Sequence, residues 1–151
     1  MCCISNNCLN FWFSPSLGGH TIGTSHCSAF SNRLYNFTGK GDVDQTLDND
    51  YVPTLKNKCK PNDLTTLVEM DPGSFKTFDT SYYKLIAKRR SLLTSDDTLL
   101  TNAEAKALVM RLANSPSEFF KEFGASMVKM GNIGVKTSID GEIRKKCAVV
   151  N

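Results

Sequence analysis

The chain has 151 residues, enough for one domain with a hydrophobic core. Its composition, 40% apolar and 22% charged, is ordinary for a globular protein. The net charge of +3 is too small to indicate nucleic-acid binding, and no apolar run is long enough to span a bilayer. These values argue against a nucleic-acid-binding protein and against a membrane-spanning one.

The first 17 residues form a cysteine-rich leader that lacks the basic start and continuous apolar run of a signal peptide. The chain nevertheless has six cysteines without a CxxC pair, and it has a glycosylation sequon at Asn36. Both features are typical of a secreted, disulfide-bearing protein. Zinc binding is disfavoured because the spacing matches no closed structural site. A zinc site would have to use Cys2, Cys3, Cys8, His20, His26 and Cys27.

Apolar residues recur at helical spacing after Gly18, which predicts a mainly α-helical domain with at most a short β-hairpin. Pro53 should kink or end one of these helices because a helix interior needs the amide that proline lacks. A later helix should bury one tyrosine and Ile86. In chain order, the expected helical segments are 27–34, 47–55, 81–90 and 102–113.

The helix with the clearest start begins at residues 115–118, which read SPSE. Ser115 fits the N-cap, Pro116 the first helical position and Glu118 the reciprocal position of a capping box. Gly131 fits a left-handed stop at the other end. Between them runs an apolar stripe that we expect to pack in the core rather than to form a cofactor wall. Its residues are Phe120, Phe123, Met127 and Met130.

Residues 17–23, LGGHTIG, place one of only two histidines, His20, in a frame of glycines. By itself this pattern indicates a buried structural histidine. Within residues 70–83, the nine residues 71–79 hold two carboxylates and two hydroxyls, a set of hard oxygens that suits Ca²⁺. From spacing alone, a role of these residues in turns and helix caps is favoured over a Ca²⁺ site. The oxygen-bearing residues of that loop are Asp71, Ser74, Thr77 and Asp79.

The polar gap in residues 92–100, LLTSDDTLL, holds Asp96 and Asp97 between leucine pairs. A carboxylate beside apolar residues needs a partner. One interpretation is a helix N-cap made by Ser95 or Asp96. The other is a carboxylate directed at a buried cation or at an imidazole N–H.

Taken together and in this order, the segments resemble the proximal half of plant secretory (class III) haem peroxidases. The matching motifs are GGHTIG, C…RLYNFTG, MDPGSFKTFDTSYYK, LLTSD, FFKEFGASMVKMGNI and GEIRKKC. The resemblance covers Gly18 to Asn151. It implies that residues 18–151 form the proximal domain of an incomplete haem-peroxidase fold, and that residues 1–17 are a leader that does not match.

The resemblance implies that His20 is the axial ligand of the iron of haem b. Asp96 would accept a hydrogen bond from the other ring nitrogen of His20. Such a bond makes the imidazole a stronger donor and lowers the reduction potential of the iron.

The resemblance also implies a proximal Ca²⁺ site. Ser74 stands where the family usually has threonine, which keeps the hydroxyl, and Thr77 would bind through its backbone carbonyl. Because Thr21 directly follows His20, loss of Ca²⁺ should loosen the iron–histidine geometry. The implied ligands are Thr21, Asp71, Ser74, Thr77 and Asp79.

Several further expectations come from the same resemblance. Cys27 and Cys59 match a disulfide pair, and Asn36 matches a glycosylation position. Cys147 would lack its partner. Ser91 stands where the family has glycine, so a strained left-handed residue is expected there.

The implied activity is the H₂O₂-dependent one-electron oxidation of small phenolic donors by an extracellular protein, in response to oxidative stress and in the breakdown of hydrogen peroxide. No stretch of the 151 residues reads like the distal segment R-L-x-F-H-D-C, with its histidine and arginine. We therefore expect weak or no turnover from this chain. The alternative is a non-enzymatic haem- and Ca²⁺-binding remnant, or a truncated gene product. The oligomeric state and the donor substrate stay open.

Overall fold

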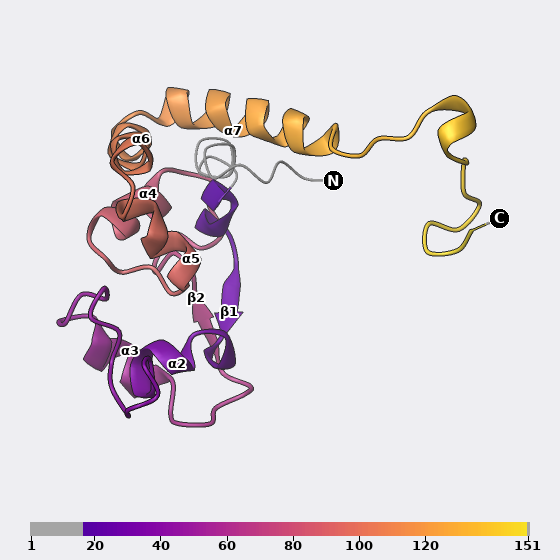
Figure 1. The fold of residues 1–151 in the computed structure, drawn as a ribbon. Helices are drawn as coiled ribbons and strands as arrows, with labels where there is room; N and C mark the ends of the chain where they lie inside the picture. The colour runs from indigo at the N-terminus through magenta and orange to yellow at the C-terminus, as the bar shows by residue number, and fades with distance from the viewer. Residues whose placement is uncertain (1–16, 151) are drawn as a thin grey trace.

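The computed structural model describes residues 17–150. The predicted leader, with Cys2, Cys3 and Cys8, therefore lies outside the described residues except for Leu17. The described part is mainly helical, as predicted, with α-helices (α) and 3₁₀-helices (η) joined by long loops (Figure 1). In chain order the elements are η1 (Leu17–Thr21), β1 (Thr24–His26), η2 (Cys27–Ala29), α2 (Ser31–Tyr35), α3 (Val52–Lys58), β2 (Leu67–Glu69), α4 (Ser81–Ala87), α5 (Thr94–Asp97), η3 (Thr98–Leu100), α6 (Ala103–Asn114), α7 (Pro116–Gly131) and η4 (Ser138–Asp140).

A small antiparallel sheet connects two distant parts of the chain. Strands β1 and β2 pair with Ser25 opposite Val68. Residues 27–66, which include α2 and α3, lie between the two strands. The pairing is therefore a long-range contact and not a tight-turn hairpin, and it holds the segment after His20 against the start of the oxygen-rich loop.

The first hydrophobic core lies around α2 and α3. The disulfide Cys27–Cys59 closes this unit, and both cysteines are fully buried. The disulfide pairing expected from the family resemblance is thus present. The other buried members are Phe30, Leu34, Leu47, Val52, Leu55, Val68 and Leu92.

The second core lies between α4, α6 and the start of α7. Its aromatic centre is Phe119. The centroid of the Phe119 ring lies 4.8 Å from that of the Phe78 ring and 5.5 Å from that of the Tyr83 ring. Both Tyr82 and Tyr83 are buried, where the sequence predicted one tyrosine. The remaining buried members are Ile86, Leu99, Leu108, Val109, Leu112 and Ala113.

Side-chain caps begin both long helices. The Asn102 side chain accepts hydrogen bonds from the amides of Glu104 and Ala105 at the start of α6. Ser115 accepts from the amide of Glu118 at the start of α7, with Pro116 in the first turn. The predicted start at Ser115 is confirmed, and the segment predicted over 102–113 is α6.

The apolar stripe of α7 does not pack in the core as predicted. Phe120, Met127 and Met130 are 48%, 39% and 49% exposed, and Phe123 only borders the second core. The buried residues of α7 are instead Phe119 and Ser126, and the helix runs outward from α6 toward the C-terminal segment (Figure 1). Only its beginning, around Phe119, reaches the α4–α6 unit.

The end of α7 also differs from the expectation. Gly131 is the last helical residue and has no positive φ, whereas Gly134 has a φ of 67°. The amide of Asn132 ends the helix by bonding to the carbonyls of Val128 and Lys129. The segment that follows runs away from the rest of the molecule (Figure 1). None of the described helices is long and apolar enough to cross a membrane.

Pro53 begins a helix rather than kinking or ending one. It occupies the first turn of α3, where the amide that proline lacks has no helical partner. Leu47 and Tyr51 precede this helix, so only the last part of the predicted 47–55 segment, from Val52 to Leu55, is helical. Helix α4 likewise stops at Ala87 instead of running to Arg90.

The expected strain at Ser91 is wrong. The left-handed residue after α4 is Arg89, with a φ of 57°, and Ser91 has no positive φ. Ser91 is buried and donates its hydroxyl to the Asp97 carboxylate. The turn thus has its unfavourable left-handed conformation two residues earlier, at an arginine, whose Cβ atom makes that conformation costly.

Candidate functional site

Gly18 explains why the histidine motif begins with a small residue. A Cβ atom at Gly18 would lie 2.5 Å from a Phe119 ring carbon and 2.8 Å from the Tyr83 hydroxyl. Gly19 has more room, since its Cβ would lie 3.9 Å from the nearest atom, on Phe123. Gly18 therefore lets η1 lie directly against α4 and α7, which fixes where the next residues point.

His20 is held by two elements that are far away in sequence. Its Nδ1 lies 3.1 Å from Asp96 Oδ1 on α5. A carboxylate only accepts, so Nδ1 carries the proton and Nε2 is the nitrogen left to bind a metal. The His20 side chain is 30% exposed while that of Asp96 is 1% exposed. The imidazole is therefore anchored on its buried side and accessible on the other.

Tyr82 on α4 contacts the same pair. Its hydroxyl donates to Asp96 Oδ1 at 3.0 Å, and its ring lies edge-on to the His20 ring at 5.7 Å. Burial and the charge of Asp96 hold the pKa of Tyr82 well above its usual range. One carboxylate oxygen thus receives two donors, one from η1 and one from α4.

Arg33 determines where α5 lies. It donates from α2 to the backbone carbonyls of Ser91 and Leu92, at 3.1 and 2.9 Å, and it pairs with the Asp97 carboxylate. Asp44 is its second carboxylate partner, at 2.8 Å. All these groups are buried. The network anchors the segment 91–97, and with it Asp96. The N-cap residue of α5 is Leu93, so the interpretation of Ser95 or Asp96 as the helix N-cap is wrong.

The oxygen-rich loop folds around Thr21. The Thr21 hydroxyl lies 3.1 Å from Asp71 Oδ2, 3.3 Å from Asp79 Oδ1 and 3.4 Å from the Thr77 carbonyl. The Ser74 hydroxyl donates to Asp79 Oδ2 at 2.6 Å. Asp79 also accepts a hydrogen bond from the Ser81 amide at the start of α4. One residue of the loop therefore acts at a helix start, as the alternative interpretation of this loop predicts.

The charges of this loop suit a cation. Thr21 is fully buried and Asp71 is 2% exposed. Burial, together with the charges of Asp79 and Glu69, raises the pKa of Asp71. The single hydroxyl proton of Thr21 can satisfy only one of its three oxygen neighbours. A hard cation that binds oxygen ligands would neutralise the repulsion between the acceptor oxygens that receive no proton.

The structure thus brings together two groups of predicted residues. His20 and Asp96 form the first, and the oxygen-bearing residues around Thr21 form the second. Asn36 and the disulfide lie apart from both, around α2 and α3, and Asn36 is exposed. Cys147 is an exposed free thiol.

The zinc alternative loses one of its ligands in the described part of the chain. Cys27 is in a disulfide and is unavailable as a thiolate ligand. Across residues 17–150, no group of three or more His, Cys, Asp and Glu side chains is arranged to hold a metal. The set around Thr21 has only two carboxylates and relies on hydroxyl and carbonyl oxygens.

The sequence does not predict the roles of two residues of this site. Tyr82 was expected only as a possible core residue, and Arg33 had no assigned role. A signal for Tyr82 existed, because a buried carboxylate usually needs more than one donor. No pattern in the sequence, however, says which distant side chain supplies the second one.

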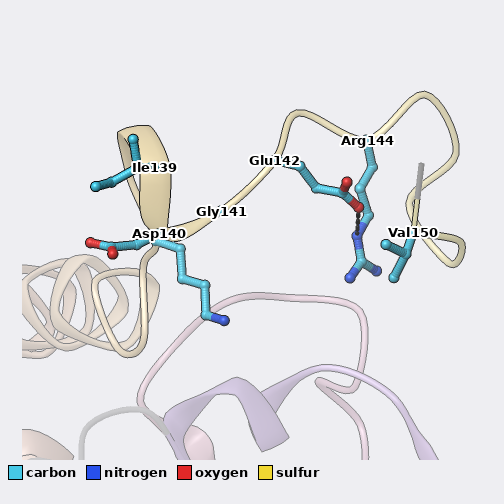
Figure 2. Close-up of a pocket in the computed structure, with 7 residues that line it drawn as sticks. Ile139, Asp140, Gly141, Glu142, Arg144 and Val150 are labelled. Carbon is cyan, nitrogen blue, oxygen red and sulfur yellow. Dashed lines mark ion pairs between the residues drawn. The ribbon is translucent and has the colours of Figure 1, made fainter.

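A separate hollow of about 460 Å³ lies in the C-terminal segment. Glu142 and Arg144 pair at 3.4 Å. Figure 2 shows this pair with Val150 on one side of the hollow and Ile139 with Asp140 on the other. Ile139 is 98% exposed. None of the residues predicted to bind iron or calcium lines this hollow.

A family model for peroxidases matches residues 16–115, more than half of the chain. The chain belongs to the peroxidase family. Peroxidase 56 of Arabidopsis thaliana is 62% identical over 135 residues, which cover 89% of this chain and 41% of that protein. Peroxidase 27 of the same plant is 58% identical over 135 residues, covering 89% and 42%.

Peroxidase 1 of Oryza sativa subsp. japonica is 58% identical over 139 residues, which cover 88% of this chain and 43% of that protein. The resemblance to plant class III peroxidases is confirmed. The chain spans about two-fifths of the length of the curated peroxidases it matches.

Proposed function

We propose that this chain supplies the proximal side of a peroxidase haem site, for the H₂O₂-dependent one-electron oxidation of small phenolic donors. Residues 18–151 are the proximal domain in this proposal. The observation that carries it is the contact of 3.1 Å between His20 Nδ1 and Asp96 Oδ1. This contact leaves a partly exposed imidazole directly before Thr21, whose buried hydroxyl lies among oxygens of Asp71, Thr77 and Asp79.

The residues around His20 fit haem b. His20 Nε2 would bind the haem iron, and Asp96 holds the proton on Nδ1 and the orientation of the ring. Haem, when bound, supplies the redox chemistry of its iron. The anionic partner of Nδ1 makes the imidazole a stronger donor, which favours the oxidised iron.

The residues around Thr21 fit Ca²⁺, with side-chain oxygens from four residues and the carbonyl of Thr77. The supporting observation is the crowding of acceptors around one hydroxyl proton. Thr21 and His20 are adjacent in η1, so the two sites are mechanically coupled. The proposed ligands are Thr21, Asp71, Ser74, Thr77 and Asp79.

The proposal extends to the setting of the protein. An extracellular location agrees with the buried disulfide and with the exposed sequon at Asn36, which we assign as a glycosylation site. A role in oxidative stress and in hydrogen peroxide breakdown follows from the peroxidase reaction. Turnover by these 151 residues alone is weak, because none of them provides the distal histidine and arginine; general acid–base help is typically worth about 10²- to 10⁴-fold.

Spectroscopy of the haem-loaded chain tests the proposal. The chain should give an absorption spectrum of histidine-ligated haem. His20→Ala should remove that spectrum, whereas His26→Ala, which changes the exposed histidine of β1, should leave it unchanged. A spectrum that is the same in all three proteins would contradict ligation by His20. Phenol oxidation at the rate of an intact relative would contradict the weak turnover.

Calcium binding has its own test. A chelator should lower the thermal unfolding temperature of the wild-type chain and alter the iron spin state of the haem-loaded protein. Asp71→Asn should reduce the response to the chelator, since it removes a buried carboxylate from the set. An unfolding temperature that ignores both the chelator and added Ca²⁺ would refute the site.

A further inference from the structure

The Asp96 carboxylate has two donors on a single oxygen. His20 Nδ1 lies 3.1 Å and the Tyr82 hydroxyl 3.0 Å from Asp96 Oδ1. The distances are nearly equal, so neither donor is secondary. Tyr82 and Asp96 are 2% and 1% exposed, which keeps water from replacing either bond.

The two donors share the charge of one acceptor. A tyrosine hydroxyl is neutral at physiological pH and therefore donates at all times. Each hydrogen bond to a carboxylate oxygen withdraws some of its electron density, and the effect is large where the surroundings exclude water. The bond from Tyr82 consequently weakens the one that His20 makes to the same oxygen.

We infer that Tyr82 is a positioning residue which shares the Asp96 carboxylate with His20 and limits how anionic the His20 imidazole becomes. The inference rests on the proposed role of His20 as the haem ligand. The anionic character of an axial imidazole sets the reduction potential of the iron. Tyr82 thus moderates the electron donation that Asp96 promotes, and it raises the potential relative to a site without its hydroxyl.

The location of Tyr82 agrees with this role. Its ring meets the His20 ring edge-on at 5.7 Å and 87°, so the tyrosine also restricts rotation of the imidazole. Its neighbour Tyr83 is equally buried, but its hydroxyl lies at Gly18 and its ring packs against the rings of Phe119 and Tyr82. The two tyrosines therefore provide a matched pair of variants on one helix.

The first test uses the full chain without haem. In Tyr82→Phe the ring and its packing remain, and only the donor to Asp96 is lost. The His20 Nδ1 proton should move downfield in the NMR spectrum, since its bond to Asp96 strengthens. Tyr83→Phe should leave that signal in place. A His20 signal unchanged in Tyr82→Phe, or moved equally by both variants, would overturn the inference.

A measurement on the unmodified chain covers the case in which Tyr82→Phe does not fold. The Tyr82 hydroxyl proton should exchange slowly with water, because it is buried and bonded to Asp96. Fast exchange of that proton would overturn the inference without the use of any variant.

The second test uses the haem-loaded chain. Tyr82→Phe should shift the iron reduction potential to more negative values and raise the iron–histidine stretching frequency, while Tyr83→Phe should change neither. An unchanged potential in a protein whose spectrum depends on His20 would overturn the inference. A spectrum independent of His20 would instead refute the proposed ligation, and the haem-free test would then decide the role of Tyr82.

Discussion

At the scale of single residues, the site depends on how closely the backbone of η1 approaches α4 and α7. Gly18 makes that approach possible, and His20 follows two residues later. Neither Gly18 nor His20 has a positive φ, so glycine is needed at position 18 only because no room is left for a side chain. The histidine motif thus begins with glycine because an aromatic ring occupies the place of its side chain.

Gly18→Ala should destabilise the fold and displace His20. The new methyl group would overlap the Phe119 ring, and overpacking typically costs about 1–3 kcal/mol. Denaturant unfolding measures the loss. Gly19→Ala is the matched control, because its methyl group would make only ordinary contact, and equal losses in the two variants would disprove the spatial argument.

Asp44 stabilises the network that anchors α5. Burial raises the pKa of Asp44, but hydrogen bonds from Thr46 and Arg33 and the charge of Arg33 outweigh this effect, so the pKa lies below its usual range. Because the folded pKa is the lower one, this stability is present above the unfolded-chain pKa of about 3.9 and is lost as the pH falls through the folded pKa.

Asp44→Asn should lower the free energy of unfolding at pH 7, by up to about 3–5 kcal/mol if Arg33 is left without compensation. The variant should also lose less stability than wild type as the pH falls below about 4. Unfolding curves across pH 3–7 test both points. Asp50→Asn, at an exposed aspartate, should behave as wild type. Identical pH profiles for Asp44→Asn and wild type would contradict the linkage.

At the scale of elements, neighbouring residues determine where the long helices α6 and α7 begin, whereas distant contacts determine the position of the short helix α5. Asn102 and Ser115 cap α6 and α7 through neighbouring amides. Helix α5 has four residues and no side-chain cap, so its position depends on the contacts of Arg33 with Ser91, Leu92 and Asp97. Asp96 is therefore directed at His20 by a residue from α2.

Asn102→Ala should destabilise α6 by about 0.5–2 kcal/mol, because the amides of Glu104 and Ala105 lose their acceptor. Chemical denaturation measures the change. Asn102→Ser provides another capping oxygen and should recover most of the loss. A serine variant as unstable as the alanine variant would show that the cap is not the source of the effect.

At the scale of the whole molecule, the described part consists of two cores joined by β1–β2 and by the Arg33 network. The disulfide Cys27–Cys59 closes the first core across 32 residues of sequence. Beyond the second core, α7 and the segment after it present apolar side chains to solvent. The most exposed of these are Val128, Ile133, Val135, Ile139, Ile143 and Val150.

Removal of the disulfide by Cys27→Ser together with Cys59→Ser should lower the free energy of unfolding by about 3–4 kcal/mol, according to the loop-entropy model. Calorimetry or denaturant unfolding tests this. Cys147→Ser is the control, since that thiol is free and exposed. A double variant as stable as Cys147→Ser would contradict a structural role for the bond.

The sequence by itself determined the helical class, the start of α7 at Ser115 and the family motifs, because caps and periodicity depend on neighbouring residues. Only the tertiary structure decided that Pro53 starts a helix, that Arg89 rather than Ser91 is left-handed, and that the α7 stripe is exposed. It also decided that Tyr82 and His20 meet on one oxygen of Asp96. The physical reason for the meeting of Tyr82 and His20 on Asp96 is that these side chains lie far apart in the chain and become neighbours only on folding.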